Sequence, residues 1–122
     1  MDDAIVQLGD RSSKCRHLLG IGDVDSVRNA VERGVDTMDS SYPTKLARCG
    51  TLITKNGLIR IKQGKHSKSH GVKIDEGCEC ATCTHYDRSY LRHLFKANEP
   101  VALQLATVHN IHFMNALLYF QC

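Results

Sequence analysis

Short apolar runs and one helical apolar stripe organise the first third of the chain. Residues 17–22 form an apolar run that ends in glycines, which predicts a buried strand leading into a tight turn. The valines and alanine that follow recur at helical spacing, with Asp23 or Asp25 as the N-cap and Gly34 as the stop. Residues 35–38 then predict a second strand. A strand–helix–strand order indicates two parallel strands of an α/β sheet.

The pattern changes after Pro43. Residues 51–54 and 58–62 alternate between apolar and polar positions on either side of Asn56 and Gly57. An Asn-Gly pair in this position predicts a β-hairpin with a type I′ turn. The next segment, residues 62–70, is polar and contains glycine, which predicts an exposed loop.

Two amphipathic helices are predicted in the last third. Asp87 is placed to cap a helix over residues 87–98, with apolar residues on one face at Leu91, Leu94 and Phe95. Pro100 opens a longer helix that extends toward Gln121. Its apolar positions are Val101, Leu105, Val108, Ile111 and Leu118.

The overall composition is that of a single soluble domain or part of one. The chain has 122 residues, of which 42% are hydrophobic and 24% charged, both ordinary for globular proteins. No apolar run is long enough to span a bilayer. Residues 1–10 are acidic and lack the features of a secretory signal. We therefore expect a cytoplasmic protein without a membrane association.

The charge is unevenly distributed, although the net charge is only +3. Residues 44–74 contain no acidic residue and no aromatic residue. The cationic side chains of this basic segment are Lys45, Arg48, Lys55, Arg60, Lys62, Lys65, Lys68 and Lys73, together with His66 and His70. A segment of this kind is typical of a surface that neutralises nucleic-acid phosphates, although it could also be a solvated lysine-rich face. Without aromatic residues to stack on bases, contact with the backbone is the expected mode.

A cysteine cluster indicates a metal site. Cys78, Cys80 and Cys83 form a C-x-C-x₂-C pattern, and a histidine follows on the predicted long helix. Three thiolates and one imidazole form a ligand set of structural zinc sites. The spacing alone does not choose between His109 and His112 as the fourth ligand. The other cysteines are expected to be free thiols, as is usual in the cytosol: Cys15, Cys49 and Cys122.

Asp39 lies where the second predicted strand ends, before a Ser-Ser-Tyr-Pro turn. Chemistry in parallel α/β folds collects beyond the carboxyl ends of strands. The carboxylate could therefore be a nucleophile, a general base or a metal ligand, or it could simply bond to local backbone N–H groups in the turn.

Several motifs in order resemble those of bacterial tRNA-guanine transglycosylases. Residues 34–50 are similar to the catalytic segment of that family, G-[VI]-D-x-[FM]-D-x-x-x-P-T-[RK]-x-[AG]-R-x-G. Residues 18–22 resemble its L-M-G-V-G turn, the cysteine cluster resembles its zinc set, and residues 90–95 and 109–113 resemble flanking helices. The resemblance extends from about residue 16 to residue 114 and identifies the chain with the C-terminal portion of the family.

The resemblance implies an α/β fold that forms part of a (β/α)₈ TIM barrel. Residues 16–50 would supply its last two strands and the catalytic strand end. Residues 51–122 would form the hairpin, an inserted zinc-binding subdomain and the C-terminal helices, with residues 1–15 unassigned. One structural Zn²⁺ would be bound by Cys78, Cys80, Cys83 and His109, which by analogy selects His109 over His112.

The resemblance also implies a reaction, the exchange of guanine at the wobble position of tRNA for a 7-deazaguanine base in queuosine biosynthesis. Asp39 would be the nucleophile and form a covalent ester with the ribose. The residues matching RNA-contacting segments are Gly20, Ile21, Gly22, Asp23, Val24, Asp25 and Ser26, followed by Thr44, Lys45, Leu46, Ala47 and Arg48. The expected partners are a tRNA with G at the wobble position, the 7-deazaguanine base, and either a second copy or a complementing barrel chain.

This sequence departs from the family pattern at Leu19, Ser40 and Cys49, where methionine, cysteine and asparagine are common. The family's general acid/base aspartate and its guanine-reading aspartate, glutamine and glycine belong to earlier strands and have no counterpart here. An alternative interpretation is therefore a non-catalytic, zinc-stabilised module for tRNA binding or dimerisation.

Overall fold

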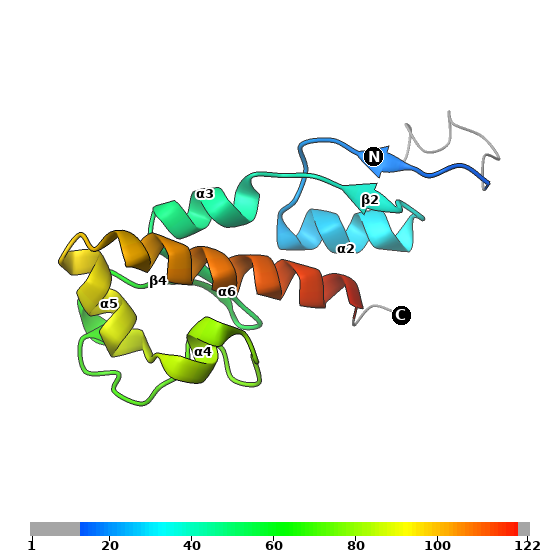
Figure 1. The fold of residues 1–122 in the computed structure, drawn as a ribbon. Coiled ribbons are helices and arrows are strands. Elements are labelled where there is room, and N and C mark those ends of the chain that lie inside the picture. The colour runs from blue at the N-terminus through cyan, green and yellow to red at the C-terminus, as the bar shows by residue number, and fades with distance from the viewer. Residues whose placement is uncertain (1–12, 120–122) are drawn as a thin grey trace. The chain divides into compact units, whose positions relative to one another are not determined.

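The computed structural model describes residues 13–119, which form a mixed α/β structure with two small sheets and two compact units (Figure 1). The first unit contains residues 13–42 and 116–119, and the second contains residues 43–115. The acidic segment 1–10 and Gln121, the expected end of the long helix, lie outside the described residues. The division of the chain at residue 50 stays a prediction.

The first unit is a strand–helix–strand motif, as predicted. Strand β1 (His17–Leu18) pairs in parallel with β2 (Thr37–Met38), and α2 (Val24–Glu32) connects them. Asp23, rather than Asp25, caps α2, because its side chain accepts the Ser26 N–H at 3.2 Å. The helix ends before Gly34, whose φ of +80° is the left-handed conformation expected of a helix stop.

The predicted strand and turn are present in residues 17–22, but the prediction that the strand is buried is wrong. The strand stops at Leu18, and Leu19 is 71% exposed. The chain turns at Gly20, with a φ of +70°, and the Gly20 N–H bonds to the Asp39 carboxylate instead of to a strand partner. The turn thus comes earlier than the apolar run suggests.

Helix α3 (Tyr42–Arg48), which belongs to the second unit from Pro43 onward, is not predicted by the apolar pattern. Its start has local signals nonetheless. The Ser40 hydroxyl accepts the Tyr42 N–H at 3.0 Å, and Pro43 lies in the first turn, where its missing N–H costs no hydrogen bond.

The predicted hairpin is present, but its turn differs. Strand β3 (Thr51–Thr54) pairs antiparallel with β4 (Gly57–Arg60), and Thr54 lies opposite Gly57. The loop residues are therefore Lys55 and Asn56. Among the described non-glycine residues, positive φ occurs at Asn98, so neither loop residue has the conformation that a type I′ turn requires. Gly57, with φ of +111°, takes the strained position instead.

Residues 62–70 are not simply an exposed loop. They include the 3₁₀-helix η1 (Gly64–His66), which lies against α5 (Arg88–Lys96). Two side chains of α5 bind this segment through its carbonyls: Arg92 Nε donates to Gln63 O at 3.1 Å and Ser89 Oγ to Ser67 O at 2.9 Å. His66 is consequently only 4% exposed.

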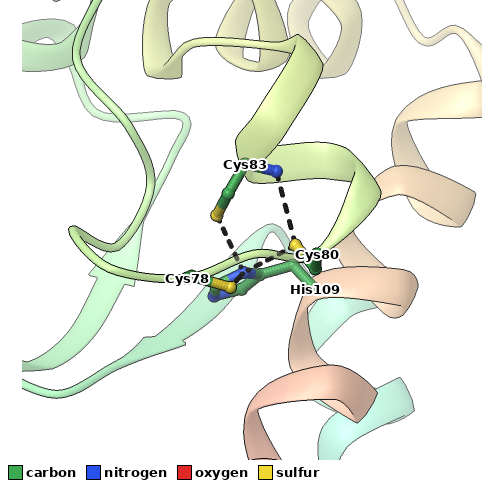
Figure 2. A group of neighbouring side chains, drawn as sticks. All are labelled: Cys78, Cys80, Cys83 and His109. Carbon is green, nitrogen blue, oxygen red and sulfur yellow. Dashed lines mark hydrogen bonds between the residues drawn. The ribbon is translucent and has the colours of Figure 1, made fainter.

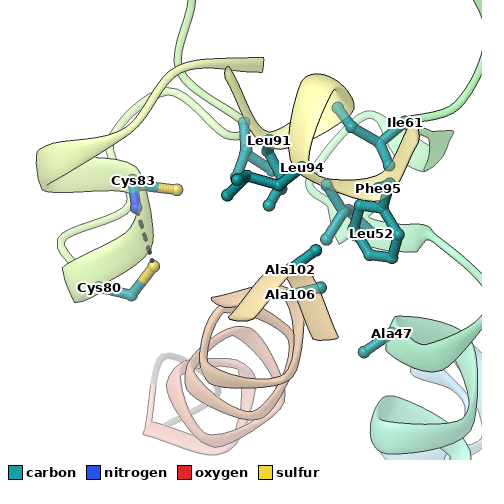
Figure 3. Close-up of a cluster of buried hydrophobic side chains, with 11 residues drawn as sticks. Ala47, Leu52, Ile61, Cys80, Cys83, Leu91, Leu94, Phe95, Ala102 and Ala106 are labelled. Carbon is teal, nitrogen blue, oxygen red and sulfur yellow. Dashed lines mark hydrogen bonds between the residues drawn. The ribbon is translucent and has the colours of Figure 1, made fainter. Parts of the chain in front are cut away.

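The core of the second unit is a cluster of buried side chains (Figure 3). They come from α3, the hairpin, the segment between the hairpin and the short helix α4 (Ala81–His85), and the three helices α4, α5 and the long α6 (Pro100–Tyr119). The three contributions from α5 are the predicted ones, Leu91, Leu94 and Phe95. The fully buried members of the cluster are Ala47, Leu52, Ile61, Ile74, Leu91 and Ala106.

The predicted apolar face of α6 is mostly not the buried one. Leu105 is partly buried against the core, as predicted, whereas Val101, Val108, Ile111 and Leu118 are each about 40% exposed. The buried side chains are Ala102, Ala106, His109, Asn110 and Met114. Asn110 explains the difference, because its Oδ1 accepts the Ile53 N–H and its Nδ2 donates to the carbonyls of Pro43 and Thr51, all at 3.0 Å. Paired polar groups can be buried, and here they orient the helix.

Candidate metal centre and a carboxylate at a strand end

Three thiols and one imidazole converge in the second unit (Figure 2). The ligand atoms of Cys78, Cys80, Cys83 and His109 all lie within 4.8 Å of one another. His109 Nδ1 is 3.7 Å from Cys78 Sγ, 3.5 Å from Cys80 Sγ and 3.3 Å from Cys83 Sγ.

These distances fit a tetrahedral metal site. Zinc–sulfur and zinc–nitrogen bonds of about 2.3 and 2.0–2.1 Å place a tetrahedral sulfur–nitrogen edge at about 3.6 Å. The three Sγ–Nδ1 separations, 3.3 to 3.7 Å, bracket that edge. The cluster therefore has the ligand number, donor chemistry and spacing to hold a metal ion.

Local structure orients the cysteines. Cys80 caps helix α4, and its Sγ accepts the Cys83 N–H at 3.3 Å, which places both sulfurs on the same side of the turn. Thr82 Oγ1 donates to Leu105 O at 2.7 Å and so joins α4 to α6. The apolar pattern does not predict α4, which the capping cysteine begins.

His109 joins the cluster to the hairpin. Its Nε2 lies 2.8 Å from the Ile53 carbonyl oxygen. A carbonyl only accepts, so Nε2 carries the proton and the Nδ1 lone pair is directed at the thiols. The structure brings His109 to the sulfurs, whereas His112 is exposed and outside the cluster.

Burial favours the neutral forms of three of the four groups. It raises the pKa of Cys83 strongly and also raises that of Cys78, while it lowers the pKa of His109. A neutral imidazole is the ligand form, and the thiols lose their protons when a metal binds.

Asp39 follows β2 in the first unit and has defined partners. Its Oδ1 accepts the Gly20 N–H at 2.8 Å, and its Oδ2 lies 3.3 Å from His17 Nε2. The Gly20 N–H is the main cause, and the His17 hydrogen bond the next, of a lowered pKa for Asp39. Its side chain is 60% exposed. Asp39 is thus an ionised and accessible carboxylate at neutral pH.

Sequence reasoning missed His17. The signal was available in the predicted topology, because two parallel strands bring their carboxyl ends together. His17 lies opposite Thr37, and its Nδ1 is 2.7 Å from Thr37 Oγ1. The side chain therefore lies between Thr37 and Asp39.

The segment 20–26, predicted to contact RNA, forms the turn after β1 and the first turn of α2. A Cβ at Gly22 would lie 2.3 Å from Ser40 Cβ, so this position needs glycine for close packing beside Asp39. The Ser26 N–H already donates a hydrogen bond to the Asp23 carboxylate. With Asp25 also acidic, this turn does not favour phosphate.

The segment 44–48, also predicted to contact RNA, lies on α3. Lys45 and Arg48 are exposed and three residues apart, which places them on one side of the helix. Thr44 and Leu46 are partly buried, and Ala47 is 0% exposed in the core. The accessible charge of this segment is therefore carried by Lys45 and Arg48.

Every lysine and arginine of the basic segment 44–74 is exposed, whereas His66 is not. A hollow of about 510 Å³ lies within this segment and is lined by Cys49, Gly50, Thr51, Arg60, Lys62 and Gln63. Lys62 Nζ also lies 5.8 Å from the centroid of the Phe95 ring. The lining contains two cations and no acid.

Cys15 and Cys49 are free and exposed, in agreement with expectation, and Cys122 lies outside the described residues. Across residues 13–119, no helix combines the length and apolar character needed to cross a bilayer.

The comparisons with known proteins agree with the resemblance seen in the sequence. A model of the family described as queuine tRNA-ribosyltransferase matches residues 4–119. The chain is similar to queuine tRNA-ribosyltransferases of Protochlamydia amoebophila, with 47% identity over 105 residues, and of Chlamydia pneumoniae, with 48% over 103 residues. Similarity to the Bacillus pumilus protein is 43% over 107 residues. These alignments cover 84–88% of this chain but 27–28% of the relatives.

Proposed function

The chain belongs to the queuine tRNA-ribosyltransferase family, and we propose that it supplies the attacking carboxylate and an RNA-binding surface for base exchange in tRNA. Asp39 is the observation that carries this proposal. It is ionised, accessible and fixed by two hydrogen bonds at the end of a parallel strand.

In the proposed first step, an Asp39 oxygen attacks C1′ of the wobble nucleotide. The C1′–N9 bond breaks, and its electron pair leaves with guanine. A carboxylate suits this displacement, because it stabilises oxocarbenium character and then forms an ester that remains reactive. In the second step, N9 of the 7-deazaguanine base gives its proton to a general base from the missing strands and attacks C1′, and the ester oxygen departs with its electron pair.

The proposed metal is one Zn²⁺, bound by Cys78, Cys80, Cys83 and His109. Four protein ligands complete its coordination, so the ion stabilises the fold and has no open position for substrate. Support comes from the spacing of the three sulfurs around Nδ1 and from the hydrogen bond between Nε2 and the Ile53 carbonyl, a contact of the kind that orients metal-binding histidines.

The proposed RNA surface is the exposed side of the basic segment 44–74. The hollow beside Arg60 and Lys62 suits a phosphate group, since both cations lie at its wall without a competing carboxylate. Lys45 and Arg48 lie on α3, the helix that follows Asp39 in the chain. We propose that they influence which anticodon is bound. Contacts by the acidic turn 20–26 would be to sugar or base rather than to phosphate.

We also propose that β1 and β2 correspond to the last two strands of a (β/α)₈ barrel. The chain spans about a quarter of the length of the relatives it matches. The groups that bind guanine and protonate it would come from earlier strands, either in a longer form of the protein or in a complementing chain. A dimer with a second copy is the related proposal for assembly.

The experiment is base exchange with labelled guanine in tRNA. The chain alone should give no exchange, because base recognition and acid assistance provide most of the rate. A mixture with a polypeptide containing the missing barrel strands should restore exchange, and Asp39→Asn should abolish it. Full activity of the Asn variant in the mixture would overturn the role of Asp39. tRNA binding that persists without restored exchange would favour the non-catalytic binding module.

A further inference from the structure

A second side chain adjoins the carboxylate of Asp39 and connects it to β2. His17 Nε2 lies 3.3 Å from Asp39 Oδ2, and His17 Nδ1 lies 2.7 Å from Thr37 Oγ1. Both ring nitrogens are therefore engaged. The Gly20 N–H binds the other carboxylate oxygen at 2.8 Å. All four residues belong to the first unit.

The two hydrogen-bond partners of His17 determine which ring nitrogen carries the proton. The Asp39 carboxylate only accepts, so His17 Nε2 must carry a proton. In a neutral ring Nδ1 is then an acceptor, and the Thr37 hydroxyl can rotate to donate to it. In a protonated ring the same hydroxyl can accept. Thr37 therefore preserves the Nε2–H contact with Asp39 in either charge state.

We propose that His17 is a positioning residue for Asp39, which it orients through Nε2–H while Thr37 holds the opposite side of the ring. This inference rests on the proposed function, in which Asp39 is the nucleophile. His17 and the Gly20 N–H hold different oxygens, so together they fix the rotation of an exposed carboxylate that would otherwise reorient freely.

The contact has a different effect on the two chemical steps. A hydrogen-bond donor favours the anionic carboxylate more than the neutral ester. It thus assists the second step, in which the C1′–O bond breaks and the electron pair returns to Asp39. Loss of His17 should slow release from the covalent intermediate more than it slows formation of that intermediate.

Two further polar groups contact residues beside the pair. Cys15 Sγ lies 3.7 Å from Thr37 Oγ1, and Asp36 Oδ2 accepts the Arg16 N–H at 2.8 Å. Neither group is bonded to Asp39. A change in the Asp39 titration after substitution of His17 would therefore report this contact.

The first measurement is NMR of the full chain. His17 should show the Nε2–H form at neutral pH, and Thr37→Val should shift the ring toward the other tautomer. The Asp39 pKa should rise in His17→Phe and return toward the original value in His17→Gln, whose amide can donate in place of Nε2. Asp23, whose pKa is lowered mainly by its hydrogen bond with Ser26 rather than by His17, serves as an internal control. An unchanged Asp39 titration in His17→Phe would overturn the inference.

The second measurement uses the reconstituted exchange reaction. His17→Phe should increase the fraction of RNA held covalently on a denaturing gel and should move the acid limb of activity to higher pH, and His17→Gln should reverse both changes. Equal loss of adduct and exchange in His17→Phe would contradict the positioning role. Exchange that survives Asp39→Asn would instead refute the proposed function, while the NMR contact would stand on its own.

Discussion

His109 Nε2 lies 2.8 Å from the carbonyl oxygen of Ile53, so a single imidazole bridges strand β3 and the cysteine cluster. The Asn110 amide, next along α6, accepts the Ile53 N–H at 3.0 Å. Two adjacent side chains of α6 thus form hydrogen bonds with the backbone of one hairpin residue, Ile53. This arrangement links the candidate metal centre to the core of the second unit.

The first prediction concerns the metal. The purified chain should contain one equivalent of zinc, and His109→Ala should lose it because the fourth ligand and the Ile53 contact disappear together. His112→Ala is the matched control and should retain zinc, since His112 is exposed and outside the cluster. Elemental analysis measures both.

The same prediction extends to stability. Binding energy for structural zinc is also folding energy, so a strong chelator should lower the thermal midpoint and the helical circular dichroism. Cys80→Ser should behave like the chelated protein, whereas Cys49→Ser should not. Equal zinc content in Cys80→Ser and the unmodified chain would exclude the assignment.

The elements that were predictable depend on local signals, and the exceptions depend on tertiary contacts. The face of α5 follows from its apolar spacing, and residue type predicts an aspartate cap on α2 but leaves Asp23 and Asp25 equivalent. The face of α6 does not, because paired burial of His109 and Asn110 outweighs the exposed valines. Periodicity counts apolar residues and assigns no value to a buried amide that completes three hydrogen bonds.

The residues of the two candidate sites also divide into those recognisable from local sequence and those placed by tertiary contacts. The cysteines are recognisable from spacing, whereas residue spacing leaves His109 and His112 equivalent until the Ile53 carbonyl orients one of them. His17 belongs to no motif, and its relation to Asp39 arises from the parallel register of β1 and β2. The predicted type I′ turn at Asn56–Gly57 is also absent, because strand pairing places Gly57 after the turn rather than within it.

The second prediction concerns His66, whose Nε2 is buried without a hydrogen-bond partner among the described residues. Burial is the main cause of its lowered pKa, and Arg88, Lys65 and Arg92 add to it. The folded state then binds fewer protons than the unfolded state, so stability falls as pH decreases below the ordinary histidine value of about 6.5.

His66→Phe removes both the unpaired nitrogen and its titration. Its free energy of unfolding should rise by about 1 kcal/mol, the lower end of the cost of an unsatisfied buried group. Between about pH 7.5 and about pH 5.5, its urea midpoint should vary less than that of the unmodified chain. His70→Phe, at an exposed position, should keep the original pH dependence. A variant as acid-sensitive as the unmodified chain would refute the explanation.

The third prediction concerns Asp87, which joins helix α5 to the preceding loop. Its Oδ1 accepts the Tyr90 N–H at 2.7 Å and its Oδ2 accepts the Gly71 N–H at 2.9 Å. The Gly71 bond is the largest cause of its lowered pKa, followed by the Tyr90 bond. The stabilisation is therefore present above the ordinary aspartate value of about 3.9 and is lost as pH falls through the folded-state value.

Asp87→Ala should cost about 1–2 kcal/mol in urea unfolding at neutral pH, because it removes the helix cap and the loop contact together. Asp87→Asn should cost less, since its amide oxygen can still cap, and it should show a weaker acid dependence below about pH 5. Equal destabilisation by the two variants would indicate that charge, rather than capping, dominates.

The last prediction concerns phosphate contact at the hollow beside Arg60 and Lys62. If each cation neutralises one phosphate of the anticodon loop, the double variant Arg60→Gln/Lys62→Gln should weaken tRNA binding and reduce the slope of log affinity against log salt by about 0.7 per contact. Filter binding at several salt concentrations measures both quantities. Lys96→Gln, an exposed lysine on α5 outside the basic segment, is the control and should leave the slope unchanged.

The comparison with Arg48 separates positioning from general attraction. The double variant should weaken tRNA and an unrelated RNA alike, because phosphates carry no sequence information. Arg48→Ala should weaken tRNA binding more than binding of the unrelated RNA, since Arg48 lies on α3, which follows Asp39 in the chain, and is proposed to act at the anticodon. Equal losses for both RNAs in Arg48→Ala would place Arg48 with the non-specific cations. An unchanged salt slope in the double variant would exclude the hollow as a phosphate site, because counterion release does not depend on which RNA is bound.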